Sequence, residues 1–366
     1  MEPEKANGRV GLTNLGNTCF LNAGVQVLRY CPELVAYFHS DAYKQHMKPD
    51  RKSTPIVEEV ADVVKGLWRD DIKFRASMAP RGFVSTANRL CQDSPAYEDL
   101  ATGGQQDASE FINFVLESLH MGLARQVQME IVGTAKTKED DIQIKALEAW
   151  TSFYKKEYSP IVENFFGQTM MTTTCDACKF KGVRFEPWMM LKCPLPSSGT
   201  TTIDDCIGLA LKSETVEDYN CDECKARGTA TRESFISRLP LHMIVMFKRF
   251  ENSAQKIRTK VEFDLNNVDM RRWLAFPGVM RNARPNYNAY GIVEHHGVSR
   301  GGHYVAYTKH NDGWLNYDDT SITSATAANI VNQDTYVVML TRKDYVTPPL
   351  FVKEKKEESR VDAPQA

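Results

Sequence analysis

Two Cys-x-x-Cys motifs in the middle of the chain constrain its fold more than any other feature of the sequence. One motif contains Cys175 and Cys178, and the other contains Cys221 and Cys224. Each motif can present two thiolates to one metal ion, and together they supply the tetrahedral four-sulfur set that zinc prefers. Because the interval between the motifs is longer than in a compact zinc ribbon, a shared metal would hold together the ends of an extended strand element.

The role of such a metal follows from its ligands. Four sulfurs leave no open position for water, so we expect a structural zinc ion rather than a catalytic one. Two redox pairs or four unrelated thiols are the alternatives. A zinc ribbon often contacts nucleic acid, but 45 Lys and Arg residues against 47 Asp and Glu residues give a net charge of -2. We therefore expect neither a nucleic-acid partner nor a membrane surface.

Composition indicates a globular protein with a substantial core, since 42% of the 366 residues are hydrophobic. No segment approaches the roughly 20 apolar residues that a membrane span needs. The N-terminal sequence MEPEKANGRVG lacks the apolar run of a secretory signal. Nine cysteines are too few and too uneven for a disulfide scaffold. We expect reduced thiols in a cytoplasmic or nuclear protein.

A polar, turn-rich segment leads to Cys19, and a helical pattern follows it. Ala23, Val27 and Tyr30 recur at helical spacing, and Pro32 is expected to stop the pattern. Cys19 should therefore lie in the first turn of a helix, where free N–H groups and the helix dipole lower a thiol's pKa. A small buried residue is the alternative, because a nucleophile needs a base from elsewhere in the chain.

Asp107 and Glu110 stand at the start of another helical pattern with the spacing of a capping box. Helix capping is a complete structural explanation for this pair. The preceding amides, Gln105 and Gln106, have no such explanation. Residues 130–150 show no convincing pattern, and we expect a surface excursion there.

The remaining segments predict a change from helix to sheet. Residues 33–100 should be mostly helical, whereas the composition from Phe165 is typical of strands. Beyond Arg238, short alternating segments separated by turns favour a mostly antiparallel sheet.

Among the eight histidines, His303 has the setting most typical of a catalytic base. Gly301 and Gly302 allow close backbone approach, and His303 then starts a strand. A tight turn returns Asp318 and Asp319 toward the level of the imidazole, where a carboxylate can orient the ring. A strand-end histidine and a solvated aspartate pair are the alternatives. Together with a thiol at a helix start, however, the set favours a cysteine hydrolase.

Several segments, in order, resemble the ubiquitin-specific proteases, a family of papain-like cysteine peptidases. The family's cysteine box is similar to GLTNLGNTCFLN, and its glutamine-aspartate box to GGQQDASEF. A sheet motif is similar to LPLHMIVMFKRF, and the histidine box to YGIVEHHGVSRGGHYVAY with WLNYDD. Both Cys-x-x-Cys motifs stand where the family carries zinc. The resemblance runs from about Gly11 to about Thr341.

The resemblance implies an α+β, papain-like fold shaped like a hand. A helical thumb would cover residues 11–160, zinc-bearing fingers 161–240 and a palm 241–342, with a mostly antiparallel palm sheet. Residues 1–10 would form a flexible N-terminus and residues 343–366 a disordered tail. The active site would lie in the cleft between thumb and palm, and the four motif cysteines would bind a structural Zn²⁺.

The family's catalytic roles carry over to matching positions. Cys19 would be the nucleophile, and His303 the general base and then the acid. Asp318 would orient His303, with Asp319 as the reserve candidate. Asn14 resembles the family's oxyanion donor, a role whose loss typically costs about 3 kcal/mol of barrier.

The resemblance also implies ubiquitin and ubiquitinated proteins as partners, with the Gly-Gly tail of ubiquitin held in a narrow cleft. Asp107 and Glu110 would hold the tail, two glycines would keep one wall thin and Tyr304 would line the other. The expected substrate-binding residues are Gln106, Asp107, Glu110, Gly301, Gly302 and Tyr304.

The sequence therefore predicts a monomeric deubiquitinating thiol hydrolase that works through a thioester. The same chemistry on another ubiquitin-like modifier is one alternative, and a catalytically silent ubiquitin-binding scaffold is another. Activation by a protein partner is a further alternative that the sequence leaves open.

Overall fold

The computed structural model describes residues 8–69, 76–250, 255–278, 285–298 and 301–343, and the backbone of Val352–Lys353. Most of the expected flexible N-terminus and of the expected tail lies outside the described residues. Val10 is fully buried, and its carbonyl oxygen accepts a 3.0 Å hydrogen bond from the side chain of Gln26. The described fold therefore includes Val10, and a flexible segment before it stays a prediction.

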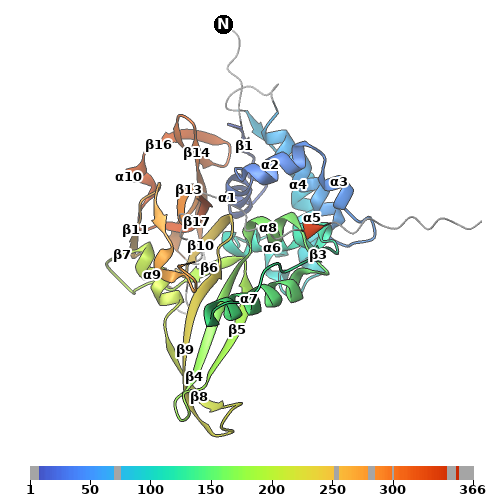
Figure 1. Cartoon of the computed structure of the whole chain (residues 1–366). Helices are drawn as coiled ribbons and strands as arrows, with labels where there is room; N and C mark the ends of the chain where they lie inside the picture. The colour runs from blue at the N-terminus through green and yellow to red at the C-terminus, as the bar shows by residue number, and fades with distance from the viewer. Residues whose placement is uncertain are drawn as a thin grey trace, which may run out of the picture.

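The N-terminal half of the chain forms a helical body, the thumb (Figure 1). Its helices are α1 (Cys19–Leu28), α2 (Pro32–His39), α3 (Tyr43–His46), α4 (Thr54–Leu67), α5 (Arg81–Gln92), η1 (Glu98–Ala101), α6 (Ala108–Leu123), α7 (Lys138–Tyr154) and α8 (Pro160–Phe165). Short strands accompany them: β1 (Gly11–Leu12), β2 (Ser77–Met78) and β3 (Gln128–Met129), the last paired with β18 (Val352–Lys353).

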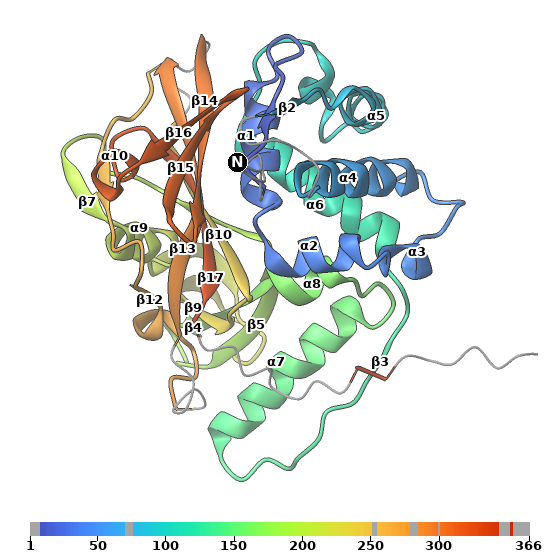
Figure 2. The same cartoon turned by 90° about the horizontal axis from the view of Figure 1, so that it is seen from above.

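Helix α1 is the centre of the molecule. All of its residues are buried, and it packs between α6 and strand β14 of the large sheet (Figure 2). Gly24 permits the contact with α6, because a Cβ there would meet Phe111 at 3.1 Å and Ile112 at 3.2 Å. Pro32 does more than stop this helix, since it occupies the first turn of α2, where its missing N–H costs nothing.

Residues 130–150 lie mostly at the surface, as expected, but most of that range is helix α7, which begins at Lys138 and which the sequence pattern did not predict. Thr137 and Asp140 form a reciprocal capping box at its start. Ala146, Trp150 and Tyr154 make one buried stripe, so the helix depends on a narrow apolar face that the charged residues around it conceal.

An eight-stranded sheet forms the palm, in the order β16-β15-β14-β13-β17-β10-β6, with β12 also paired to β13. Its strands are β6 (Met190–Cys193), β10 (His242–Phe247), β12 (Val268–Asp269), β13 (Asn286–Val298), β14 (Gly301–His310), β15 (Gly313–Asp318), β16 (Ser321–Ala325) and β17 (Thr335–Arg342). Every pairing is antiparallel except β6 with β10. The predicted α+β class with a mostly antiparallel sheet is confirmed.

The thumb covers one face of the palm sheet, and a smaller layer covers the other (Figure 2). That layer contains β7 (Thr200–Thr202), α9 (Ile203–Ala210), β11 (Lys260–Glu262), η2 (Arg271–Trp273) and α10 (Ala327–Ile330). Each face has its own apolar core, one shared with the thumb and one around α9.

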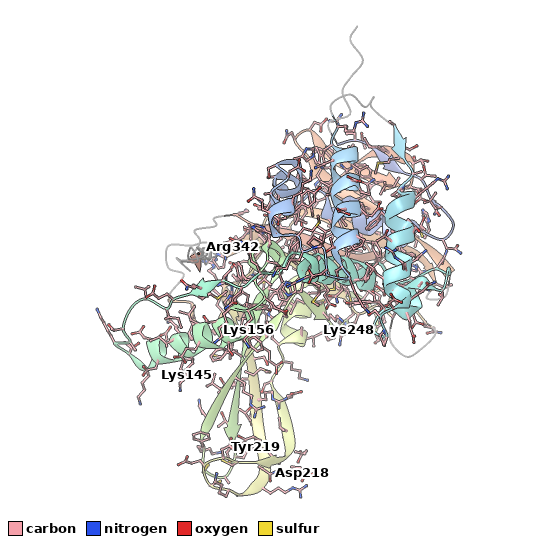
Figure 3. All side chains as sticks on the ribbon, turned by 90° about the vertical axis from the view of Figure 1, so that its right-hand side faces the viewer. Lys145, Lys156, Asp218, Tyr219, Lys248 and Arg342 are labelled. Carbon is pink, nitrogen blue, oxygen red and sulfur yellow. The ribbon has the colours of Figure 1, made fainter. Side chains whose placement is uncertain are left out.

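The fingers are a second sheet that projects away from thumb and palm (Figure 1). Its order is β5-β4-β9-β8, from β4 (Gly167–Cys175), β5 (Lys181–Trp188), β8 (Glu214–Asn220) and β9 (Arg227–Arg238), all antiparallel. Asp218 and Tyr219 lie near its far end (Figure 3).

No helix in the described part of the chain is long and apolar enough to cross a lipid bilayer.

Candidate active site

Cys19 is the first residue of α1, as the sequence predicted, and is 2% exposed. Burial raises the pKa of its thiol above the ordinary value, and the Asp319 carboxylate adds to the rise. The backbone N–H groups beside the sulfur, foremost that of Tyr304 on β14, act in the opposite direction. The expectation of a lowered pKa is therefore wrong here, because removal from water disfavours the thiolate more than the helix start favours it.

His303 and Asp318 form a hydrogen-bonded pair on adjacent strands. The antiparallel pairing of β14 with β15 brings the two side chains together, with His303 Nε2 2.6 Å from Asp318 Oδ1. When Nε2 donates to the carboxylate, Nδ1 is the nitrogen left to accept a proton. Within the described residues no hydrogen bond joins His303 to Cys19, so the thiol and the imidazole must approach more closely for proton transfer.

Asp319 holds the cysteine segment instead of the imidazole. Its Oδ2 accepts from Asn14 Nδ2 at 2.9 Å, and its Oδ1 accepts from Asn22 Nδ2 at 2.7 Å. Its backbone carbonyl accepts from the Leu12 N–H at 2.9 Å. One oxygen of the Asp319 carboxylate also lies within 4.8 Å of a ring nitrogen of His303 and of a carboxylate oxygen of Asp318. Asp319 thus joins β1 and α1 to the turn after β15, and Asn22 is a contact that the sequence analysis missed.

The orientation of the Asn14 amide is set by its oxygen. Oδ1 accepts from the N–H groups of Gly16 at 3.0 Å and Thr18 at 3.1 Å, and from the Thr18 hydroxyl at 3.2 Å. Nδ2 is therefore the atom that faces Asp319. One of its two hydrogens is used there, and the second can donate to an oxyanion that forms nearby.

A groove of about 500 Å³ separates thumb from palm. Asp107 and Glu110 line it from the start of α6, and Lys192 and Lys248 line it from the palm. This volume falls within the usual range of ligand-binding pockets. Charges of both signs therefore face whatever segment enters between the two halves.

Asp107 caps α6, as its spacing predicted. Its Oδ1 accepts from the N–H groups of Ser109 at 2.7 Å and Glu110 at 3.2 Å, and its Oδ2 accepts from the Tyr336 hydroxyl on the palm. Glu110 faces the groove, where burial and the neighbouring Asp107 charge raise the pKa of its carboxyl. Only the Asp107 half of the expected capping box forms, since no described hydrogen bond returns from the Glu110 side chain to the Asp107 N–H, and Glu110 belongs to the acidic wall of the groove.

The two adjacent glutamines have different contacts. Gln105 Nε2 donates to the Gly302 carbonyl at 2.6 Å, and its Oε1 accepts from the Gly302 N–H at 2.7 Å. This side chain pairs with the palm as a neighbouring peptide group would. Gln106, which the resemblance singled out, donates to Thr102 Oγ1 at 2.7 Å within the thumb. The sequence pattern assigns Gln105 no role, because no local signal distinguishes it from Gln106.

The two glycines before His303 are not equivalent. A Cβ at Gly302 would lie 2.3 Å from His295 Nε2 and 2.3 Å from the His296 carbonyl oxygen. Gly301 has open space around it. Packing therefore requires glycine at position 302 but not at position 301.

Tyr304 does not line the groove with its side chain. The residue is 6% exposed, and its ring contacts those of His295 and Tyr336, with centroids 4.6 and 6.2 Å away. Side chains alternate along β14, so the side chain after His303 turns toward the core, and a wall formed by Tyr304 around the ubiquitin tail stays a prediction. The backbone N–H of Tyr304 faces Cys19.

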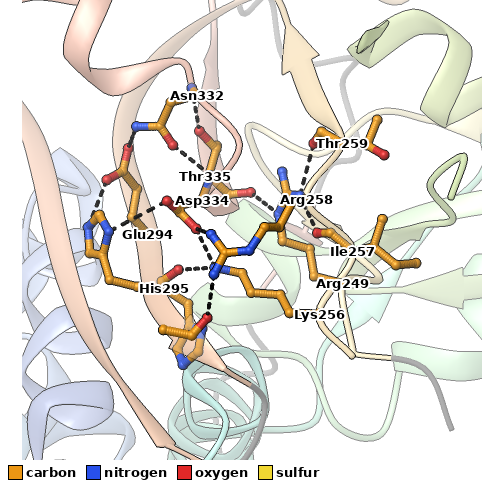
Figure 4. A network of polar contacts seen from close by, with 12 residues as sticks. Arg249, Lys256, Ile257, Arg258, Thr259, Glu294, His295, Asn332, Asp334 and Thr335 are labelled. Atoms are coloured by element: carbon orange, nitrogen blue, oxygen red, sulfur yellow. Dashed lines mark hydrogen bonds and ion pairs between the residues drawn. The ribbon is translucent and has the colours of Figure 1, made fainter. Parts of the chain in front are cut away.

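A polar network anchors β13, the strand paired with β14 (Figure 4). Lys256, whose side chain is 2% exposed, donates to the His295 carbonyl and to the Asp334 carboxylate. His296 Nδ1 lies 3.7 Å from Asp334 Oδ2. Because His296 is the register partner of His303, this network holds in place the strand that supports the imidazole.

The four cysteines of the two motifs meet in the fingers. Sulfur distances are 3.9 Å for Cys175–Cys224 and 3.6 Å for Cys178–Cys221, and all four sulfurs lie within 4.8 Å of one another. The expected meeting of two strand ends is confirmed, because the motifs end β4 and follow β8. Four sulfurs at this separation could hold a metal ion.

Both motifs form the same turn. Lys179 donates its N–H to the Cys175 carbonyl at 2.9 Å, and Lys225 to the Cys221 carbonyl at 3.0 Å. Both lysines have left-handed φ angles, 61° and 57°. The thiols titrate as a set: the backbone N–H groups of Cys224 and its neighbour lower the pKa of Cys221 to about 7, whereas, against the lowering effect of the Phe180 N–H, desolvation and the neighbouring thiols raise the pKa of Cys178 to about 12.

Comparison with known proteins agrees with this geometry. Residues 10–340 match the family model described as ubiquitin carboxyl-terminal hydrolase. Usp2 of Drosophila melanogaster is 30% identical over 93% of this chain, and human ubiquitin carboxyl-terminal hydrolase 2 is 27% identical over 95%. The chain spans 35% of the fly protein and 57% of the human protein.

Solved structures share the fold. The SAGA DUB module Ubp8(C146A)/Sgf11/Sus1/Sgf73 bound to monoubiquitin matches with a TM-score of 0.72 at 21% identity, covering 94% of this chain and 72% of that one. The module bound to ubiquitin aldehyde matches with a TM-score of 0.71 at 22% identity, covering 94% and 72%. Because the family model covers residues 10–340, the chain belongs to the ubiquitin carboxyl-terminal hydrolase family.

Proposed function

We propose that this protein is a deubiquitinating thiol hydrolase, which cleaves the isopeptide or peptide bond after the C-terminal glycine of ubiquitin. The observation that carries the proposal is the 2.6 Å contact of His303 Nε2 with Asp318 Oδ1. The residue after His303 on β14, Tyr304, directs its backbone N–H at Cys19. Membership of the family supports the substrate, as does the ubiquitin bound in the similar Ubp8 module.

The reaction begins when His303 Nδ1 takes the proton of Cys19. The raised pKa of the thiol makes this base necessary near neutral pH. The thiolate attacks the carbonyl carbon of the terminal glycine, while an N–H of Asn14 stabilises the negative charge on the oxygen. The imidazolium then protonates the leaving amine as the C–N bond breaks. Water, deprotonated by His303, hydrolyses the thioester and restores the thiol.

Asp318 orients His303 throughout, and its carboxylate stabilises the imidazolium. Asp319 acts indirectly, because it positions the Asn14 amide and the start of α1. This division supports Asp318 as the orienting group of the triad and makes Asp319 a positioning residue.

The tail of ubiquitin, Leu-Arg-Leu-Arg-Gly-Gly, would enter the groove between thumb and palm. Its arginines need acidic partners, and the Asp107–Glu110 wall supplies carboxylates there. The open space at Gly301 is consistent with a thin wall near the Gly-Gly end. A substrate contact for Gln106 stays a prediction.

The donor set in the fingers supports a structural zinc ion held by Cys175, Cys178, Cys221 and Cys224. When bound, zinc supplies a cross-link between the two finger hairpins and no reaction chemistry. Cys221→Ser should remove bound zinc and weaken ubiquitin binding several-fold, while alkylation of Cys19 by iodoacetamide continues unchanged. Elemental analysis and binding titrations would check this, and unchanged zinc content would refute the ligand set.

The proposed compartment is a reducing one, the cytoplasm or the nucleus, because a four-thiolate site needs reduced cysteines. A monomeric working form stays a prediction from the sequence. The lack of a hydrogen bond between Cys19 and His303 among the described contacts leaves room for activation by a protein partner. Adding cell extract to the assay below would reveal such a partner.

The decisive experiment is reaction of the purified protein with ubiquitin that carries a C-terminal electrophile, beside the same probes built on other ubiquitin-like modifiers. We expect a covalent adduct of ubiquitin on Cys19, absent in Cys19→Ser and strongly slowed in His303→Ala. Reaction with a non-ubiquitin probe alone would replace the substrate. Tight ubiquitin binding with no adduct and no hydrolysis, even with extract, would indicate a silent scaffold.

A further inference from the structure

Three ligand-type side chains from thumb and palm meet where α2 faces β10, away from the proposed active site. Cys31 is the N-cap residue of α2, Glu33 lies in its first turn and His242 is the first residue of β10. The sulfur, one carboxylate oxygen and one imidazole nitrogen all lie within 4.8 Å of one another. Segments that are far apart in sequence thus converge on one point.

The cluster is enclosed by protein and opens at one residue. His242 Nε2 lies 2.5 Å from Glu33 Oε2, and Cys31 Sγ lies 3.6 Å from the same oxygen. Cys31 is fully buried and His242 is 1% exposed, whereas the side chain of Glu33 is 40% exposed. An ion from solvent could therefore reach the thiol and the imidazole past Glu33.

Two buried polar atoms beside the cluster have no hydrogen-bond partner in the described part of the chain. They are His242 Nδ1 and the hydroxyl of Tyr290, whose ring packs edge-on against His242 with centroids 5.5 Å apart. Phe165 contacts the imidazole with a centroid distance of 5.4 Å. Because buried polar groups are normally satisfied, the unpaired Tyr290 hydroxyl favours a polar or ionic partner beside the imidazole. An ion held at Nε2, the nitrogen that meets Glu33, would not reach Nδ1 on the other side of the ring.

The fingers offer an internal comparison. There too, side chains that could bind one metal ion make short contacts with each other, at 3.6 and 3.9 Å between sulfurs. The hydrogen bonds among Cys31, Glu33 and His242 follow the same pattern. In both clusters donor atoms converge from separate chain segments, as a shared ion requires.

We propose that Cys31, Glu33 and His242 bind a second zinc ion, which joins helix α2 of the thumb to strand β10 of the palm. Thiolate, imidazole and carboxylate are the three ligand types that zinc accepts in proteins. Three protein ligands leave the fourth position to water, on the side that Glu33 opens to solvent. Binding displaces the thiol proton of Cys31, which passes to solvent, so uptake of zinc releases acid.

This site would connect thumb to palm, because Cys31 and Glu33 belong to the thumb and His242 belongs to the palm. Helix α2 directly follows the helix that begins at Cys19. Occupancy should raise the thermal stability of the protein without any contact with the reacting atoms. The inference does not depend on the proposed function, and it concerns residues that take no part in that reaction.

The test counts metal sites in the full-length protein. Chelator-treated protein is titrated with zinc against a chromophoric competitor, and the same sample is loaded with cadmium for ¹¹³Cd NMR, in which each site gives its own resonance. We expect the wild-type protein to bind one equivalent more than Cys31→Ser and to show one more resonance. The difference holds whether or not the fingers bind metal, so failure of one site is distinguishable from failure of the other.

Two further variants keep the test sharp. Glu33→Gln changes a half-exposed side chain and should fold normally, and we expect it to weaken the additional site at least tenfold. Cys91→Ser, which alters a thumb thiol that is 2% exposed and outside the cluster, should retain the wild-type metal count. Equal counts in wild-type, Cys31→Ser and Glu33→Gln proteins, or a wild-type protein with no resonance beyond that of the fingers, would overturn the proposal.

Discussion

Asp318 and Asp319 are neighbours in sequence with separate contacts. Asp318 is the last residue of β15 and faces His303. Asp319 has a left-handed φ of 51°, which turns its carboxylate toward Asn14 and Asn22. At the scale of single residues, this change of backbone direction separates the role of orienting the imidazole from that of positioning the oxyanion donor.

Asn14→Ala should lower kcat about 10²- to 10³-fold with little change in KM, because an oxyanion donor acts mainly in the transition state. Asn22→Ala is the matched control, since it removes the other side-chain amide that donates a hydrogen bond to Asp319. Hydrolysis of a ubiquitin C-terminal fluorogenic amide measures both. Equal losses of kcat in the two variants would show that Asn14 acts only through the packing of Asp319.

Gly302→Ala should destabilise the fold by about 1–3 kcal/mol, because the new Cβ would collide with His295 and the adjacent carbonyl. Gly301→Ala should stay within about 0.5 kcal/mol of wild type, since space is open there. Denaturant unfolding separates the two. A raised KM for ubiquitin substrates in Gly301→Ala alone would support a thin wall, and equal destabilisation would contradict the packing argument.

At the scale of elements, the contact between the loop before α6 and the start of β14 connects thumb to palm beside the imidazole. It consists of the two hydrogen bonds of the Gln105 side chain with Gly302. Each such bond contributes about 0.5–1.5 kcal/mol. The bridge can therefore restrain the strand end without preventing its movement.

Gln105→Ala should speed hydrogen–deuterium exchange at the Gly302 amide and lower kcat/KM several-fold, because the start of β14 loses its thumb partner. Gln106→Ala, the adjacent control, should leave that exchange unchanged, because Gln106 bonds within the thumb. Mass-spectrometric exchange on both variants checks this. Matching profiles for the two would refute a bridging role for Gln105.

At the scale of the whole molecule, two histidines that are largely removed from water, His295 and His310, link stability to acidity. Burial lowers the pKa of His295 and of His310 to about 4, below the ordinary value near 6.5. Their neutral forms therefore contribute stability that is fully present above about pH 6.5 and is lost as the pH falls toward 4. His296 acts oppositely, because its contact with Glu294 raises its pKa, so its contribution is lost as the pH rises.

We expect the free energy of unfolding to fall between about pH 6.5 and 4, and His310→Gln to reduce that fall by about 1–2 kcal/mol, an amount discounted because the ring is partly exposed. Denaturant titrations across this range provide the measurement. His39→Gln, at an exposed position, is the control and should keep the wild-type slope. A wild-type slope in His310→Gln would contradict the assignment.

Local patterns accounted for features that depend on a few consecutive residues. The helix that starts at Cys19, the cap at Asp107, the alternating strands and the two Cys-x-x-Cys turns all follow from spacing and residue type. The resemblance to a family extended these features to a complete fold class. Helix α7 was missed because its buried stripe is narrow among charged residues.

By itself, the sequence determined the α+β class, the family, the thiol at a helix start and the cysteines that can share a metal. Only the tertiary structure decided that Gln105 rather than Gln106 reaches the palm, that Asn22 joins Asp319, and that the Cys19 thiol has a raised pKa. These outcomes depend on contacts between residues as many as 297 positions apart and on exclusion of water. The periodicity of a sequence predicts neither long-range contacts nor exclusion of water, because it describes the faces of one segment and not the residues that pack against them.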